Sequence, residues 1–280
     1  QYGKAFNAHY QAQGFHPLMV FDGMTGDCLK VELRAGNVYT SRNIVSFIGP
    51  LLSHYQKRFP SSYRIVRGDS GFAHKELYKL CETLNTNYVI RLKANATLYR
   101  LAKEVMDVFL EECSLQYSQQ FYGEFEYQAK SWDRPRRVIV QVRRKAGELI
   151  PDYLFLVTNM ETRPEMVISL YAKRGTMENY IKECKNGFRM DKVSHKHWMT
   201  NVNRIQLMVL AYNLINGFRR LTLPHEFSKM QIETLRIKLI KIAAKRVKQS
   251  RRIMFKLCSH HPYKEVFHHC LKTIQAIQLE

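Results

Sequence analysis

The stretch "YRIVRGDSGFAHKELYKLCETLNTNYVIRLKAN" (residues 63–95) indicates an α/β fold. Its first residues are typical of a β-strand, and residues 70–73 are typical of a turn. Leu77, Leu80 and Leu84 then recur at helical spacing, and "YVIRL" predicts a second strand. A strand, a helix and a strand in this order form a βαβ unit, whose two strands run parallel. We therefore expect part of a parallel sheet with a helix packed on it.

The flanking segments extend this α/β pattern. Before it, the sequence predicts a β-hairpin and then a helix, over residues 16–35 and 41–58. After it, we expect an amphipathic helix, a β-rich segment that returns to the main sheet, and two further helices, over residues 97–113, 118–158, 163–186 and 198–220. The tail alternates apolar and basic residues from about residue 236, which indicates strands.

The charge of the 280-residue chain points to a polyanionic partner. Lys and Arg number 44 against 24 acids, which gives a formal net charge of +20. Such an excess is typical of proteins that neutralise nucleic-acid phosphates and release their counterions. No apolar run is long enough to predict a membrane span. The six cysteines contain no C-x-x-C pair and no signal peptide is visible, so we expect reduced thiols in a cytoplasmic protein.

Asp69 is the first candidate site residue. It follows the first strand of the βαβ unit, where open α/β sheets place their ligand sites. Gly68 and Gly71 let the backbone turn tightly around it. An ordinary turn aspartate that caps the next helix is an equally good interpretation. An R-G-D adhesion loop is disfavoured because the triplet ends a strand expected to be buried.

Glu178 is the second candidate, within "YAKRGTMENYIKECKNGF" (residues 171–188). On a continuous helix, Glu178 would share about 80° of circumference with four other residues, which are Tyr171, Arg174, Lys182 and Lys185. A single carboxylate among cations suits a metal ion bound beside a phosphate backbone. The alternative is a surface lattice of helix ion pairs, each worth a few tenths of a kcal/mol.

The basic tail is the third candidate. Residues 236–256 carry nine Lys or Arg and no acid, and they include Arg246, Lys248, Arg251 and Arg252. Alternation along a ribbon predicts that many of these cations share one face and follow a phosphate backbone. A solubilising surface is the alternative interpretation. A cluster of Cys and His in residues 258–270 has spacings that fit no standard zinc finger.

The combination of these motifs resembles a known family. "YAKRGTMENYIKECK" matches, at every fixed position, the Y-x2-R-x3-E-x6-K signature of DDE transposases of the insertion-sequence-four superfamily. "VRGDSGFA", "YVIRLKAN" and "LAYNLINGFRRL" are similar to the thirteen-eighty family within it. The resemblance extends over essentially the whole chain.

The resemblance implies an RNase H-like mixed sheet with flanking helices, interrupted by a β-rich insertion. It divides the chain into four segments. These are a first part of the core with Asp69, a helix with the β-rich insertion, a second part of the core with the Glu178 helix, and a basic C-terminal extension, over residues 1–96, 97–152, 153–222 and 223–280.

The resemblance also implies roles for residues. Asp69 and Glu178 would be catalytic and would bind two Mg²⁺ ions, with Mn²⁺ as a substitute. Tyr171, Arg174 and Lys185 would grip DNA near the transposon end, together with Lys182. Trp132 of the insertion would stack on a flipped base, although a core tryptophan is the stronger interpretation.

One expected residue is missing. The first catalytic aspartate of the family lies on a strand before the hairpin, and Asp22 and Asp27 fall in the hairpin turn, where turn chemistry explains them. We therefore expect the chain to be a fragment that begins shortly after that aspartate, with its ability to cut DNA in question.

The resemblance thus implies a bacterial cut-and-paste transposase, associated with the nucleoid. It would act as a homodimer on terminal inverted repeats and target DNA. Two alternatives stay open at this point. One is an RNase H-like nuclease or resolvase without strand transfer, and the other is a catalytically inert, DNA-binding remnant of a transposase.

Overall fold

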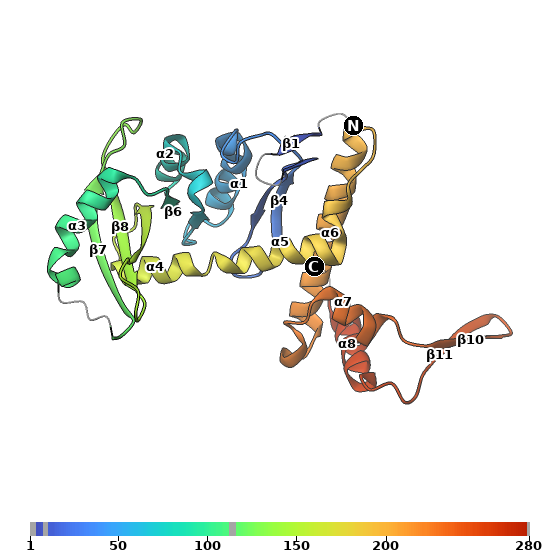
Figure 1. Ribbon diagram of the computed structural model, residues 1–280. Coiled ribbons are helices and arrows are strands. Elements are labelled where there is room, and N and C mark those ends of the chain that lie inside the picture. The colour runs from blue at the N-terminus through green and yellow to red at the C-terminus, as the bar shows by residue number, and fades with distance from the viewer. Residues whose placement is uncertain (1–3, 8–10, 112–115, 279–280) are drawn as a thin grey trace. The chain divides into compact units, whose positions relative to one another are not determined.

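The computed structural model describes residues 4–7, 11–111 and 116–278. The chain divides into two compact units. We call Val38–Gly175 the sheet unit, and Gln1–Asn37 together with Thr176–Glu280 the hairpin–helix unit. Each is described by itself, with the element labels of Figure 1.

The sheet unit is built on a five-stranded mixed sheet. Its strands lie in the order β5 (Ile65–Gly68), β6 (Asn87–Leu92), β9 (Asp152–Thr158), β8 (Arg136–Arg144), β7 (Gln119–Tyr127). β5 and β6 are parallel and are joined by α2 (Lys75–Thr83), so the predicted βαβ unit is confirmed. The other pairs are antiparallel.

The β-rich segment continues this same sheet. β9 pairs with β6 on one side and with β8 on the other, which confirms the predicted return to the main sheet. Val138, Ile139 and Val140 of β8 are all fully buried. Since successive residues of a strand point to opposite faces, β8 is covered on both sides.

Among its described residues, the sheet unit has four α-helices that flank the sheet, which are α1 (Ile44–Arg58), α2, α3 (Ala96–Glu111) and α4 (Pro164–Ala172). The predicted helices at 41–58 and 97–113 are thereby confirmed, except that residues 112–113 lie outside the described residues. α3 packs on β7 at Gly123 (Figure 1), where a Cβ atom would come within 2.9 Å of the Met106 sulfur. Glycine at this position allows the helix to approach the strand closely.

A partly buried ion-pair network joins α2 and β6 to the start of β8. The Arg136 guanidinium donates to both carboxylate oxygens of Glu82, at 3.1 and 3.2 Å, and Tyr88 donates to the same carboxylate at 2.9 Å. The Arg136 side chain is 3% exposed and also lies over the ring of Trp132. Burial would raise the pKa of Glu82, but the bonds from Arg136 and Tyr88 outweigh burial and hold that pKa below its ordinary value of 4.5.

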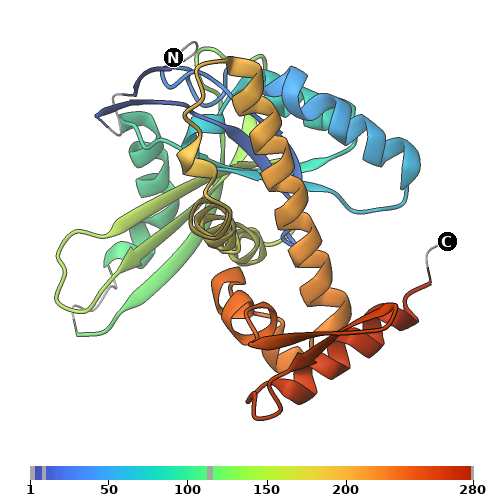
Figure 2. The same cartoon turned by 90° about the vertical axis from the view of Figure 1, so that its right-hand side faces the viewer.

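The hairpin–helix unit packs a β-hairpin against a long helix. The hairpin of β3 (Leu18–Phe21) and β4 (Cys28–Glu32) confirms the prediction for residues 16–35, and β1 (Ala5–Asn7) pairs with β2 (Ala12–Gly14) beside it. α6 (Trp198–Thr222) runs along the hairpin (Figure 2). Val31, Cys184 and Tyr212 are central to the shared core.

Amide side chains of α6 complete the hydrogen bonding of this hairpin. Asn213 accepts from the Cys28 N–H at 2.8 Å and donates to the Cys28 carbonyl at 2.9 Å. Asn216 and Tyr212 both donate to the Gly26 carbonyl, at 3.0 and 2.9 Å. The "LAYNLINGFRRL" motif therefore satisfies backbone groups that burial against α6 removes from water.

The turn of the hairpin explains Asp22. Its Oδ1 accepts from the backbone N–H groups of Met24 and Thr25, at 2.9 and 2.6 Å. Asp27 pairs with Arg220 of α6 at 3.1 Å. Turn chemistry thus accounts for Asp22, as the sequence predicts, and an ion pair that the sequence does not predict accounts for the Asp27 side chain.

The predicted helix over residues 163–186 is wrong in one respect, because it is two helices. α4 ends at Ala172, Lys173 and Arg174 form a turn, and α5 begins at Gly175 and ends at Phe188. The unit boundary follows Gly175. The assumption of one continuous helical face therefore holds only within α5, and Tyr171 and Arg174 do not belong to that face.

The tail is partly helical, which corrects the prediction of strands from residue 236. α7 (Ile232–Leu235) leads into the π-helical turn η4 (Arg236–Ile240). Leu235 and Leu239, four residues apart, form a buried cluster with Leu223, which follows α6, and with Cys270 of α8 (Lys264–Ala276). This burial favours helical geometry over an extended chain. Strands follow only as β10 (Ala244–Gln249) and β11 (Arg252–Leu257), which form a two-stranded ribbon.

Two further expectations concern the membrane and the thiols. Over the described residues, every helix is too short or too polar to cross a bilayer. Within the same residues the cysteines are free, and Cys113 lies outside them. Burial raises the pKa of the Cys28 and Cys81 thiols to about 12.

The Glu82 network predicts a pH-dependent stability. The depressed pKa of Glu82 means that its contribution is complete above pH 4.5 and is lost as the pH falls further. Glu82→Gln should therefore lower the free energy of unfolding by about 3 kcal/mol at neutral pH, and the difference should shrink in acid. Urea unfolding across pH measures this. Glu104→Gln, which breaks an exposed pair with Arg100, is the control and should change little.

The two hydrogen bonds between Asn213 and the Cys28 backbone predict that two asparagines of α6 differ in their contribution to stability. Asn213→Ala leaves the Cys28 N–H and carbonyl without their partner, which should cost about 1–3 kcal/mol. Asn203→Ala, on the exposed face of α6, should be neutral or slightly stabilising because alanine favours helices. Thermal unfolding of the two variants compares them. Equal melting temperatures would show that the Asn213–Cys28 hydrogen bonds contribute nothing to stability.

Candidate functional site

Asp69 directly follows β5, at the carboxyl end of an edge strand of the sheet. It precedes the short 3-10 helix η1 (Ser70–Phe72), and its Oδ1 accepts from the Gly71 N–H at 2.9 Å. A Cβ atom on Gly71 would lie 3.0 Å from that oxygen, so glycine leaves room for the carboxylate. The capping interpretation is thereby confirmed. It does not exclude a ligand, because the Asp69 side chain is 39% exposed.

Two arginines connect this strand end to α4 and to the turn that follows it. Arg174 donates from Nη2 to Asp69 Oδ2 at 3.2 Å, which forms an ion pair. Arg67 of β5 donates to the Leu170 carbonyl at 2.9 Å, near the end of α4. The signature arginine and the candidate aspartate, 105 residues apart, are thus in contact within the sheet unit. Sequence spacing does not predict this contact, since it requires the sheet to bring β5 beside α4.

Tyr171 is a core residue in the structure. Its side chain is 9% exposed and packs with Val167, Ile168 and Leu156. It thereby helps to seat α4 on the sheet and to place the turn that carries Arg174. A role for Tyr171 in gripping DNA stays a prediction.

Glu178 lies in the first turn of α5, in the hairpin–helix unit. Negative charge is favourable there because the helix dipole presents its positive end. Glu178, Lys182 and Lys185 are all exposed and follow one another at spacings of four and three, so they share one surface of α5. The opposite side of the helix carries Cys184 and Gly187 into the core.

The structure groups the predicted residues by unit. Asp69 and Arg174 lie in the sheet unit, and Glu178, Lys182 and Lys185 lie in the hairpin–helix unit. A shared metal site of Asp69 and Glu178 therefore stays a prediction.

Trp132 and the basic tail complete the set of predicted residues. Trp132 is 9% exposed and lies edge-on to Tyr78 and Tyr127, which confirms the core interpretation. In the β10–β11 ribbon, Arg246 pairs with Phe255 and Lys248 with Ile253 across the two strands, so these four side chains share one face. The other face carries Lys245 and Arg252.

The expectation that the cations of this ribbon gather on one face is therefore wrong. The register distributes them over both faces, and Arg251 lies in the connecting turn. The ribbon projects from the helices that precede and follow it (Figure 1). Nearly all of its side chains are exposed.

Carboxylate oxygens are the ligands that Mg²⁺ prefers, so the donor chemistry of Asp69 and Glu178 fits a divalent ion. The number of donors does not. The residues that the structure describes contain no group of three or more His, Cys, Asp or Glu side chains able to hold a metal, the Cys and His of residues 258–270 included. Moreover, both Asp69 oxygens already accept hydrogen bonds. A metal site built on these acids would therefore need at least one further donor.

Comparison with known protein families decides the identity of the chain. The family described as transposase DDE domain group 1 matches residues 1–279. The chain belongs to this DDE transposase family. A comparison with curated proteins found no match. The mixed α/β architecture, with a five-stranded sheet and flanking helices, is consistent with a DDE transposase fold.

Family membership implies a transposase that acts on DNA with divalent metal ions. The strong positive charge of the chain agrees with DNA as the partner.

Sequence reasoning missed Arg67 as a positioning residue. It stands two residues before Asp69 and on the same strand, where an arginine among "RIVRG" carries no periodic signal. Its contact with the Leu170 carbonyl depends on the sheet packing against α4, which no local pattern reveals.

Proposed function

We propose that the chain is the catalytic domain of a cut-and-paste transposase of the insertion-sequence-four superfamily, thirteen-eighty family. It cleaves phosphodiester bonds at transposon ends and joins those ends to target DNA, as a homodimer on DNA. The observation that carries the proposal is the ion pair between Asp69 and Arg174. It brings together the aspartate of "VRGDSGFA" and the arginine of the Y-x2-R-x3-E-x6-K signature in a chain of the DDE family.

The proposal assigns the fold to the RNase H-like class, interrupted over residues 97–152 by a helix and a β-rich insertion. Support comes from the parallel pair β5–β6 beside an antiparallel β9, and from Asp69 at the end of β5. Ligand sites of α/β sheets lie at the carboxyl ends of strands.

In this function Asp69 and Glu178 hold divalent metal, and a third acid is needed to complete the site. The ions supply Lewis-acid stabilisation of charge on the attacking and leaving oxygens. Arg174 orients the Asp69 carboxylate and keeps it in place before an ion arrives. Lys182 and Lys185, beside Glu178 on the surface of α5, hold the DNA backbone through charge-assisted bonds to phosphate.

The ribbon β10–β11 contacts DNA from both faces. Arg246 and Lys248 lie on one face, Arg252 on the other and Arg251 at the tip. The major groove of B-DNA admits a two-stranded β-ribbon, and phosphates line both of its walls. A ribbon with cations on both faces fits this arrangement better than it fits a flat track along one backbone.

The shared metal site can be tested with paramagnetic Mn²⁺. If one site contains both acids, Mn²⁺ should broaden the amide NMR signals of Gly71 and Glu178 over the same concentration range. Glu178→Gln should then move the broadening at Gly71 to higher Mn²⁺. Glu165→Gln, an exposed acid in the first turn of α4, is the matched control and should have no effect. Broadening at Gly71 that is unchanged by Glu178→Gln would refute the shared site.

Joining of pre-cut transposon ends to target DNA separates the transposase from its alternatives. A nuclease or resolvase would cut without joining, and an inert remnant would bind DNA without either reaction. Glu178→Gln in a chain that cuts should abolish cleavage and leave DNA binding largely intact, because binding rests on the cations.

The ribbon predicts equal effects of two charge-matched double variants. Arg246→Ala with Lys248→Ala removes two cations from one face, and Lys245→Ala with Lys256→Ala removes two from the other. Each should weaken duplex binding and reduce the slope of log K against log salt by up to about 1.8. Titrations at several salt concentrations measure this slope. Loss in only one of the two variants would indicate a one-sided track.

A further inference from the structure

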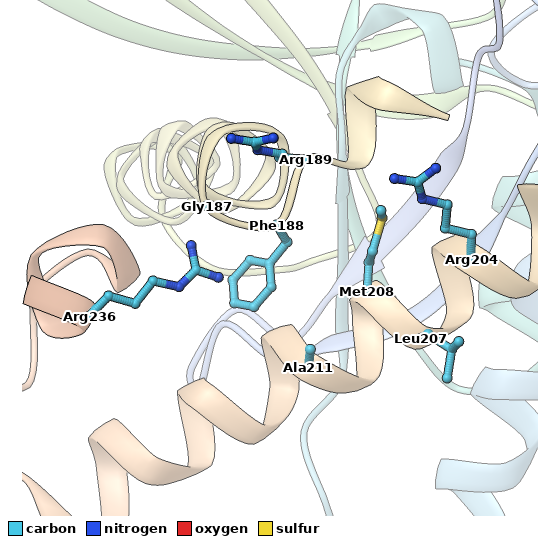
Figure 3. Close-up of a pocket in the computed structure, with 8 residues that line it drawn as sticks. All are labelled: Gly187, Phe188, Arg189, Arg204, Leu207, Met208, Ala211 and Arg236. Carbon is cyan, nitrogen blue, oxygen red and sulfur yellow. The ribbon is translucent and has the colours of Figure 1, made fainter. Parts of the chain in front are cut away.

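A pocket of about 340 Å³ lies within the hairpin–helix unit, where the end of α5 meets α6 and the start of η4 (Figure 3). Its wall is made by three arginines and by apolar groups. They are Gly187, Phe188, Arg189, Arg204, Leu207, Met208, Ala211 and Arg236. The volume is within the range of about 300–1,000 Å³ that is typical of small-ligand sites.

The three arginines come from three different elements and have no acid among them. Across the described part of the chain, neither Arg189 nor Arg204 nor Arg236 forms an ion pair. By contrast, Arg219 on the same α6 is bound by both oxygens of Glu183. Guanidinium groups that line one pocket repel each other unless an anion lies between them. The pocket thus has the charge expected of a phosphate-binding site.

Two of these arginines are constrained by their local geometry. Arg189 has a φ of 55°, in the left-handed region that costs an L-residue about 1–2 kcal/mol. Arg236 places its guanidinium over the ring of Phe188, 5.9 Å from the centroid. Such stacking orients the planar group and leaves its N–H donors directed outward. Arginine stands here at a position where glycine would be relaxed, and such strained positions often occur at functional sites.

The apolar part of the pocket narrows the class of ligand. Leu207 is 68% exposed, and Met208 lies next to it on α6 (Figure 3). A bare phosphate or the outside of a duplex needs no apolar wall. A nucleotide whose base has left the stack offers both a phosphate for the guanidinium groups and a flat apolar face that can pack on Leu207 and Met208.

We propose that this pocket binds one unstacked nucleotide of a DNA strand. Arg189, Arg204 and Arg236 hold its phosphate, and the base lies against the apolar wall. The inference rests on the proposed function only in taking DNA as the partner. It needs neither Asp69, Glu178 nor a metal ion.

The test uses a pocket variant designed to keep the fold. Arg189→Gly removes the guanidinium and relieves the positive φ, and Arg204→Ala places a good helix former on an exposed turn of α6. Arg236→Gln keeps a polar side chain at η4. These three changes are combined.

The matched control removes the same charge elsewhere in the unit. Lys229→Ala, Lys264→Ala and Lys272→Ala change three exposed lysines that lie outside the pocket. Because both triple variants lose three positive charges, long-range attraction to DNA falls equally in the two. Any remaining difference belongs to the pocket.

Binding is measured by fluorescence anisotropy with EDTA present, on a duplex and on the same duplex with one unpaired nucleotide. For the unpaired probe, the pocket triple should bind at least about tenfold more weakly than the control triple. For the perfect duplex the two triples should bind alike. A deoxynucleoside monophosphate should compete for the unpaired probe better than inorganic phosphate.

Three results would overturn the proposal. They are equal affinity of the two triples for the unpaired probe, the same loss on both probes, and equal competition by nucleotide and phosphate. Arg204→Ala alone, which changes one exposed helical residue, repeats the comparison if the triple variant does not fold. Because metal is absent, failure here leaves the Mn²⁺ test of Asp69 and Glu178 unaffected.

Discussion

The contacts that hold the fold together depend on where the chain places its few carboxylates among its many cations. Lys and Arg exceed Asp and Glu by 20, so the position of each carboxylate decides which cations are fixed. Glu82 fixes Arg136 in the sheet unit, Glu183 fixes Arg219 in the hairpin–helix unit, and Asp69 holds Arg174. Each of these pairs joins elements that are far apart in the sequence. In the proposed function, DNA phosphate neutralises the cations that line the α6 pocket and those that cover the ribbon.

Local patterns predicted the elements well, because their cause is local. The strand, turn and helix around Asp69 follow from apolar spacing and from two glycines, and the hairpin of residues 16–35 follows from alternation and its turn. The break between α4 and α5 was missed because Lys173 and Arg174 are good helix formers. The helical start of the tail was missed because Leu235 and Leu239 are buried by α8, and sequence alternation alone does not reveal this tertiary contact.

The sequence predicted only those candidate site residues that belong to a recognisable motif. Asp69 stands at the strand end where the pattern "VRGDSGFA" places it, and its contact with Arg174 gives the signature arginine a structural task. Tyr171 shows the limit of a motif, since the side chain belongs to the core and acts on the site through the position of α4. Arg189, Arg204 and Arg236 carried no signal at all. They are scattered over 48 positions of sequence and line one pocket only through the packing of α5, α6 and η4.

The β10–β11 ribbon has only two strands, so each strand keeps one outer edge outside any sheet of the described residues. Ile253 and Phe255 add exposed apolar surface beside those edges. Open edges with apolar neighbours invite strand-to-strand association between chains, and lysines on an edge are a common means of preventing it. The cations of the ribbon would therefore serve two purposes, which are the DNA binding proposed above and the prevention of edge-to-edge association. A variant whose ribbon Lys and Arg are replaced by uncharged residues would bind nucleic acid more weakly under the proposed function, and it would form intermolecular β-structure more readily.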